Sequence, residues 1–147
     1  MKIKKGFLSL KSLGFICSIG LLAFALSSCT TKVNFLKSSV VPAAKGTVKV
    51  TKDGNNNYKI KVKISNLAES TQLTPPKSVY VVWLMSDSKA IKNIGQIVSG
   101  TGFMSKKLKA NFETTSSYKP SKIFLTAEND PGVQYPFSEV VLTTGVF

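Results

Sequence analysis

The sequence contains no histidine, no arginine and only two cysteines, Cys17 and Cys29. Without histidine, the base that most often activates a serine or cysteine nucleophile is missing, and so is a common nitrogen ligand of zinc. All 20 basic residues are lysine. Nucleic-acid recognition favours the bidentate guanidinium group, so the absence of arginine argues against nucleic acid as a partner.

The N-terminal segment has the layout of an export signal. A lysine-rich start is followed by an uncharged apolar run over residues 13–26, which is long enough for a signal peptide but short for a bilayer span. The run ends in Leu26-Ser27-Ser28-Cys29. An aliphatic residue, two small residues and a cysteine resemble the processing site of bacterial lipoproteins. The resemblance implies a signal peptide over residues 1–28, cleavage before Cys29 and a lipid on its thiol.

The alternative is an uncleaved membrane anchor that reaches back to Phe7. Such an anchor would place Lys11 inside the bilayer, where a charge is costly. Lipidation of Cys29 implies instead a protein held at the cell envelope by its acyl chains. In lipoproteins of bacteria with two membranes, an aspartate after the cysteine often signals retention in the inner membrane. Thr30 stands there, which implies the outer membrane if the source has one.

From Cys29 onward the chain carries 16 lysines against 7 acids. This excess favours anionic partners such as lipopolysaccharide, acidic glycans or lipid headgroups. The other interpretation stays open, because lysines also keep the surface and the edges of a strand-rich domain in solvent. Residues 29–45 mix polar and scattered apolar residues and predict a tether, followed by a single domain over residues 46–147.

Seven short segments of the domain have strand patterns separated by turn residues, at 47–52, 58–64, 79–85, 91–98, 104–113, 123–127 and 140–144. The pattern predicts an all-β fold, an antiparallel immunoglobulin-like β-sandwich of about seven strands. The segment 79–85 is apolar throughout and predicts a central strand, with Trp83 at the centre of the core against the facing sheet. Gly95 predicts a bulge or a close backbone contact.

Several short motifs lie in the last 69 residues of the 147-residue chain: VYVVWL at 79–84, NIGQ at 93–96, FLTAE at 124–128 before Pro131-Gly132, and Pro136 before VVLTTG at 140–145. In these motifs the chain resembles the extracytoplasmic domain of anti-sigma-K factors. The resemblance implies the sandwich fold and a sensing or binding role in the envelope. Those factors carry a cytoplasmic zinc-containing domain and a membrane helix, which a lipoprotein leader replaces here, so inhibition of a sigma factor is not implied.

Residues 58–64 alternate strictly and place Lys59, Lys61 and Lys63 on one face of a strand, with ammonium groups about 7 Å apart. This row is the candidate face for an anionic ligand, and Lys49 and Lys52 are expected to extend it. A purely solvated face is the alternative. A second candidate is a binding rim of exposed aromatic side chains, which instead often pack against loops. Its members are Tyr118, Tyr135 and Phe137.

No set of residues predicts catalysis or a cofactor. Asp87, Glu128 and Asp130, with Asn129, would suit calcium if brought together, but Asn129 and Asp130 also suit a turn before Pro131. The serine–lysine neighbours 88–89 and 105–106 would point to opposite faces of a strand and not meet. The sequence therefore predicts no metal and no enzyme, but a lipid-anchored module that binds another envelope protein. Binding of anionic envelope polymers is the alternative, and a hydrolase with an unrecognised site is the third possibility.

Overall fold

The computed structural model describes residues 29–101 and 108–147. The strands in this part of the chain are β1 (Thr30–Asn34), β2 (Lys45–Lys52), β3 (Tyr58–Ser65), β4 (Val79–Ser86), β5 (Ile91–Ile97), β6 (Gly100–Thr101), β7 (Leu108–Ser116), β8 (Pro120–Glu128) and β9 (Val140–Thr143). A short 3-10 turn, η1 (Ser70–Gln72), lies between β3 and β4. Every pair of neighbouring strands is antiparallel.

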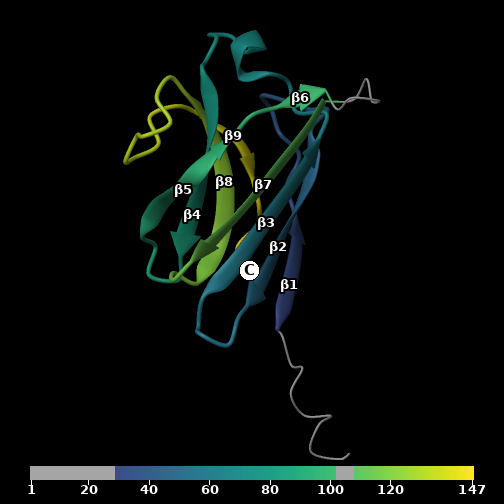
Figure 1. Ribbon diagram of the computed structural model, residues 1–147. Helices are drawn as coiled ribbons and strands as arrows, with labels where there is room; N and C mark the ends of the chain where they lie inside the picture. Colours follow the sequence, from purple (N-terminus) through teal and green to yellow (C-terminus); the bar gives the residue numbers. More distant parts are fainter. Residues whose placement is uncertain (1–28, 102–107) are drawn as a thin grey trace, which may run out of the picture.

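The strands form two sheets that lie face to face (Figure 1), one with the order β1-β2-β3-β7-β6 and one with the order β5-β4-β8-β9. With β2 as strand A, these are the A-B-E-D and C′-C-F-G orders of an immunoglobulin-like sandwich, and β1 is an additional edge strand. The predicted fold class is confirmed. All seven predicted segments contain a strand, and β1 and β6 are further strands that the sequence pattern did not predict. Residues 104–107 of one predicted strand lie outside the described residues.

The main core lies between the two sheets and is formed by the inward-facing side chains of their strands. Ile60, Val62 and Ile64 of β3 point inward and are buried, whereas the lysines between them point outward. Across the gap, Tyr80 and Leu84 of β4 are also buried in this core. The inner residues of both sheets thus exclude water from one continuous apolar layer, which leaves the other face of the five-stranded sheet to solvent.

Trp83 is buried, but its predicted position is wrong. It belongs with Val79, Val81 and Phe124 to a second, smaller apolar cluster, separate from the main core. On β4 these odd-numbered residues alternate with the inner residues, so the cluster lies on the outer face of the four-stranded sheet. The Trp83 ring stacks on Phe124, which is directly opposite on β8, with ring centroids 6.2 Å apart. β4 is apolar on both faces, and a continuous apolar run does not indicate which face meets the other sheet.

Residues 29–45 also differ from the predicted tether. Residues 30–34 pair with β2, and the chain then crosses to the other sheet, where the Leu36 N–H donates to the Thr143 carbonyl at 2.8 Å. The Ser38 hydroxyl donates to the Val141 carbonyl, and Val41 is buried in the core. The physical reason is that β2 offers an unpaired edge, while the scattered apolar residues of the segment find places in the core. The segment therefore fastens the two sheets together.

Gly95 confirms the predicted bulge. The register between β4 and β5 shifts between Val82 and Trp83, and Gly95 has φ +136°, a conformation that side chains rarely adopt. A Cβ at this position would lie 2.7 Å from Cε2 of Phe112 on the opposite sheet. Glycine thus lets the Phe112 ring approach the backbone of β5.

Candidate functional site

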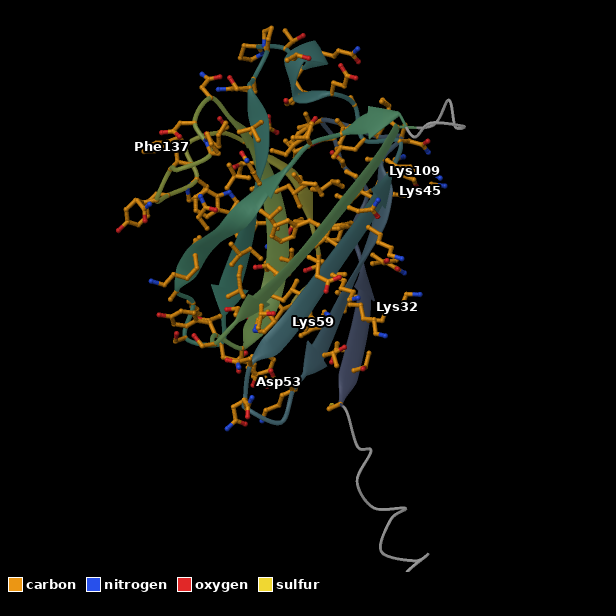
Figure 2. The ribbon with its side chains drawn as sticks, in the orientation of Figure 1. Lys32, Lys45, Asp53, Lys59, Lys109 and Phe137 are labelled. Carbon is orange, nitrogen blue, oxygen red and sulfur yellow. The ribbon has the colours of Figure 1, made fainter. Side chains whose placement is uncertain are left out.

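The outer face of the five-stranded sheet carries the largest set of like charges in the described residues. The pairing register aligns Lys32, Lys49 and Lys61 in one row across β1, β2 and β3, and aligns Thr47, Lys63 and Asn111 in the next. We call this surface the basic face; its lysines are Lys32, Lys45, Lys49, Lys59, Lys61, Lys63 and Lys109. Figure 2 shows Lys32, Lys45, Lys59 and Lys109 along these strands.

The predicted row of Lys59, Lys61 and Lys63 does lie on one face, and Lys49 extends it. Lys52 does not, because it shares the inward side of β2 with Val48 and Val50 and sits at the end of the strand opposite Tyr58. The sequence pattern did not reveal that other strands add lysines to this face. Lys32 lies in the segment expected to be a tether, and the position of Lys109 beside β3 depends on strand order, which period-two alternation does not show.

One acid, Glu113 of β7, lies on the basic face among the described residues. Its carboxylate contacts Lys59 Nζ at 2.6 Å and Lys61 Nζ at 3.0 Å. The hydrogen bonds from Lys59 and Lys61 lower the pKa of Glu113 below its usual value. All three side chains are about half exposed, so the pairs add little stability. Their effect is to compensate the charge of the part of the face nearest the β2–β3 hairpin.

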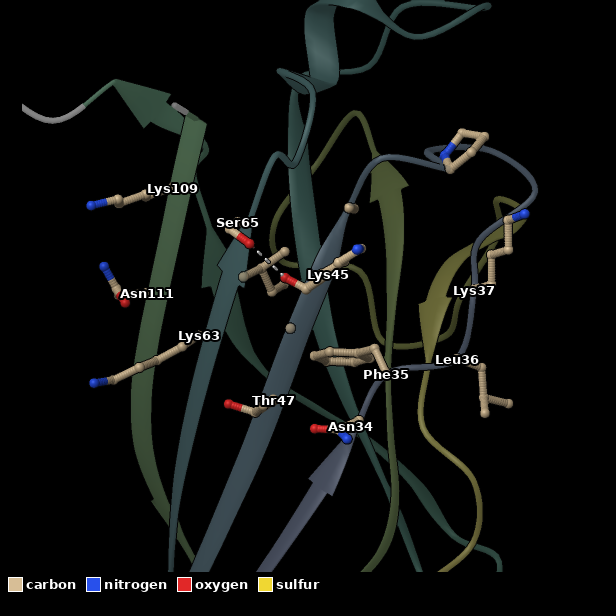
Figure 3. A pocket seen from close by; sticks show the side chains of 14 residues that line it. Asn34, Phe35, Leu36, Lys37, Lys45, Thr47, Lys63, Ser65, Lys109 and Asn111 are labelled. Carbon is tan, nitrogen blue, oxygen red and sulfur yellow. Dashed lines mark hydrogen bonds between the residues drawn. The ribbon is translucent and has the colours of Figure 1, made fainter. Parts of the chain in front are cut away.

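At the other end of the basic face, where β1 stops, the surface is hollowed into a shallow groove of about 920 Å³ (Figure 3). Its lining residues are Asn34, Phe35, Leu36, Lys37, Pro42, Ala44, Lys45, Gly46, Thr47, Lys63, Ile64, Ser65, Lys109 and Asn111. We call it the distal groove. Its lining contains four lysines and no acid, together with hydroxyl and amide groups and an apolar part around Phe35 and Leu36.

A second surface is the loop between β8 and β9, residues 129–139. Tyr135 is 70% exposed and Phe137 is 79% exposed. The predicted aromatic rim is not a single patch, because Tyr118 lies in the turn between β7 and β8, at the other end of the nine-residue β8. There the Lys92 ammonium lies 5.4 Å from the centroid of the Tyr118 ring.

A buried carboxylate fixes the β8–β9 loop. Glu128 is 3% exposed, and its Oε1 accepts hydrogen bonds from the Thr126 hydroxyl at 2.7 Å and from the N–H groups of Phe137 at 3.1 Å and Ser138 at 3.2 Å. Its Oε2 accepts from the Ser138 hydroxyl at 3.0 Å. Thr126 in turn accepts from Trp83 Nε1 at 2.8 Å. Burial raises the pKa of the Glu128 carboxyl, but these donors together outweigh it and leave the pKa below its usual value.

The other side of the loop is held by Asn93 of β5. Its side-chain amide donates to the carbonyl oxygens of Pro131 and Val133, each at 2.9 Å. Val133 packs against the cluster around Trp83. The loop therefore folds back over the outer face of the four-stranded sheet, and its aromatic residues are presented from a fixed support.

The structure does not bring together the residues that would suit calcium, Asp87, Glu128 and Asp130. Asp87 lies at the far end of β4 and accepts a hydrogen bond from Lys119 Nζ at 2.8 Å, whereas Glu128 pairs with the first residue of β4. Asp130 accepts from the Gly132 N–H at 2.8 Å, as the turn interpretation predicts. In the described part of the chain, no three His, Cys, Asp or Glu side chains come close enough to bind a metal ion. Ser105 and Lys106 lie outside that part, and the Ser88 hydroxyl hydrogen-bonds to that of Ser86.

Comparisons with known proteins do not assign the chain to a family. No protein-family model matches the sequence. A comparison with curated proteins likewise finds no significant match. The resemblance to anti-sigma-K factors therefore stays a prediction.

Cys29, the predicted lipidation site, is exposed and directly precedes β1. Its carbonyl accepts a hydrogen bond from the Lys52 N–H at 3.2 Å, so it lies beside the β2–β3 hairpin. The predicted signal peptide, residues 1–28, lies outside the described residues. Over residues 29–101 and 108–147, no helix is both long enough and apolar enough to cross a bilayer.

Proposed function

We propose that the protein is a lipid-anchored cell-envelope protein whose β-sandwich is a non-catalytic module that binds another envelope protein. The observation that carries this function is the β8–β9 loop, where Tyr135 and Phe137 are 70% and 79% exposed while Glu128 and Asn93 hold the backbone. Aromatic side chains on a fixed backbone lose little conformational freedom on binding and are frequent anchors of protein interfaces.

The chemistry of this loop indicates the kind of partner. The chain from residue 123 to its end contains no lysine, although the protein as a whole is strongly basic. Two exposed acids, Asp130 and Glu139, lie in the loop with the aromatic side chains. A complementary partner would offer an apolar pocket for an aromatic ring and basic residues around it.

The lipid anchor is supported by the leader and by the position of Cys29. A lipid on Cys29 would hold the end of the sandwich that carries the β2–β3 hairpin against the membrane, because no spacer separates Cys29 from β1. The β8–β9 loop lies at the opposite end of the strands (Figure 1). The loop would therefore face away from the membrane, which we propose is the outer membrane in a source with two membranes.

Replacing Cys29 by serine is expected to release the protein from the membrane fraction. Each buried methylene of an acyl chain contributes about 0.8 kcal/mol to membrane binding, and the variant would have no acyl chain. Fractionation with mass spectrometry of the N-terminus measures this, and Thr30→Ser is the matched control that should stay attached. A wild-type protein with an unmodified N-terminus at Met1 would contradict the proposed anchor.

A photo-crosslinking amino acid placed at position 137 is expected to yield one defined adduct with another envelope protein in intact cells. The same amino acid at position 146 is the control, because Val146 is also 76% exposed but lies at the other end of β8. The protein identified by mass spectrometry is then purified, and Phe137→Ser should weaken its binding by at least roughly tenfold, as expected for an interface anchor. Equal adducts from both positions, or unchanged affinity, would count against the loop as the binding surface.

A second candidate function is binding of an anionic envelope polymer. The specific observation in its favour is the basic face, on which seven lysines stand against one acid among the described residues. Such a surface attracts polyanions over a distance of about 10 Å at moderate salt.

A further inference from the structure

We propose that an anionic glycan binds in the distal groove and on the adjoining part of the basic face around Lys63 and Lys109, rather than around Lys59 and Lys61. The proposal rests on the second candidate function and names its site and ligand class. Three observations carry it: the position of Glu113, the chemistry of the distal groove, and the distance of this groove from Cys29.

Glu113 divides the basic face into two parts. It forms ion pairs with Lys59 and Lys61, so these two lysines already have an anionic partner within the protein. Lys63 and Lys109 have no such ion pair with any other described residue. They are diagonal neighbours on adjacent strands, with Cβ atoms about 7–8 Å apart or slightly less. An incoming anion therefore meets uncompensated charge at Lys63 and Lys109 and must compete with Glu113 at Lys59 and Lys61.

The distal groove has lysines on two sides and an apolar part, which is more than the binding of a small anion requires. Figure 3 shows Lys63, Lys109 and Asn111 projecting to one side of β3 and β7, whereas Lys37, Phe35 and Leu36 lie on the other side of β2. A small ion would reach one side only. A chain of sugar rings that crosses the end of the sheet would place its negative groups near lysines on both sides. It would also rest the apolar face of a ring on Leu36, which is 56% exposed.

The distance of the groove from Cys29 favours a glycan over lipid headgroups as the anionic ligand. β1 runs from Cys29 to the groove at Asn34, and five residues of strand span roughly 16 Å. With a lipid on Cys29, headgroups of the same membrane would meet the hairpin end of the face, where Lys59 is paired with Glu113. The distal groove would stand off from the membrane, where a polymer of the envelope can reach it.

The test compares two double variants, each of which removes two positive charges from the same sheet. The first combines Lys63→Gln with Lys109→Gln, and the second combines Lys59→Gln with Lys61→Gln. Both are made in the Cys29→Ser form, and binding to dextran sulfate is measured with neutral dextran as the blank. The first pair is expected to weaken binding at least roughly tenfold and the second less than about threefold, since two charge-assisted contacts are lost only in the first. Glu113→Gln is expected to strengthen binding. Circular dichroism should be the same for all variants, because the altered side chains point into solvent.

Two further measurements test the ligand class. Leu36→Ser is expected to weaken binding of dextran sulfate by roughly threefold but to leave binding of polyphosphate, which has no sugar rings, unchanged. Tighter binding to phosphatidylglycerol vesicles than to dextran sulfate would overturn the glycan as the occupant. Equal losses from the two lysine pairs would overturn the groove as the site while leaving anion binding by the face intact. If the protein bound dextran sulfate no better than neutral dextran, the second candidate function itself would fail.

Discussion

Replacing Trp83 by alanine is expected to lower the free energy of unfolding by about 3–5 kcal/mol, the usual cost of removing a large buried aromatic side chain. Trp83 is fully buried, stacks on Phe124 and donates its indole N–H to Thr126. The loss would be a large part of the roughly 5–15 kcal/mol that stabilises a domain. Trp83 is the one tryptophan of the chain, so unfolding by urea should be followed by far-ultraviolet circular dichroism rather than by fluorescence.

Trp83→Phe is the matched comparison. Phenylalanine keeps an aromatic ring against Phe124 but removes the donor to Thr126, so we expect a smaller cost of about 1–2 kcal/mol. The difference between the two variants measures the packing of the outer cluster. If alanine and phenylalanine cost the same, the contribution of Trp83 would come from its hydrogen bond and not from its burial.

Glu128→Gln is expected to destabilise the protein by about 1.5–3 kcal/mol at neutral pH, because the acceptor of several hydrogen bonds loses its charge. The pKa of this carboxyl in the folded protein lies below its usual value of 4.5. A lowered pKa means that the unfolded chain takes up the proton first as the pH falls. The stability contributed by Glu128 is therefore fully present above about pH 4.5, and is lost as the pH falls through the lower pKa of the folded state.

The measurement is the difference in unfolding free energy between the wild type and Glu128→Gln, determined from urea curves across the acidic range. Taking the difference removes the contributions of other acids whose pKa values are lowered, such as Asp53 and Glu113. We expect a constant difference above about pH 5 that shrinks toward more acidic pH. Glu139→Gln, an exposed change in the same loop, should stay within about 0.5 kcal/mol of the wild type. A difference that grows on acidification would contradict the assignment of Glu128 as a charged acceptor.

The parts of the fold that the sequence predicted well are those where local pattern and environment agree. In β3, strict alternation already separates the buried Ile60 and Val62 from the outward lysines. A sheet with one face in the core and the other in solvent requires this alternation of apolar and polar residues. Gly95 is similar, because a glycine inside a strand has few explanations other than a bulge or a close contact.

The parts that could not be predicted depend on neighbours that are remote in sequence. The short β1 has little strand signal of its own and is held by the edge of β2. In the sequence Glu128 is an acid at the end of a strand, and nothing local indicates that Phe137 and Ser138 of the β8–β9 loop return to form hydrogen bonds with it. The basic face also depends on strand order, since β7 supplies both the additional Lys109 and the competing Glu113.

The direct continuation of Cys29 into β1 has a mechanical consequence. If a partner pulls on the β8–β9 loop while acyl chains hold Cys29, the force enters at one end of the sandwich and leaves at the other, along the strands. The hydrogen bonds between β1 and β2 are perpendicular to that direction, so all of them are loaded in shear at once instead of opening one after another. A protein built in this way would resist tension between its membrane and its partner better than one suspended from a peeling terminal strand.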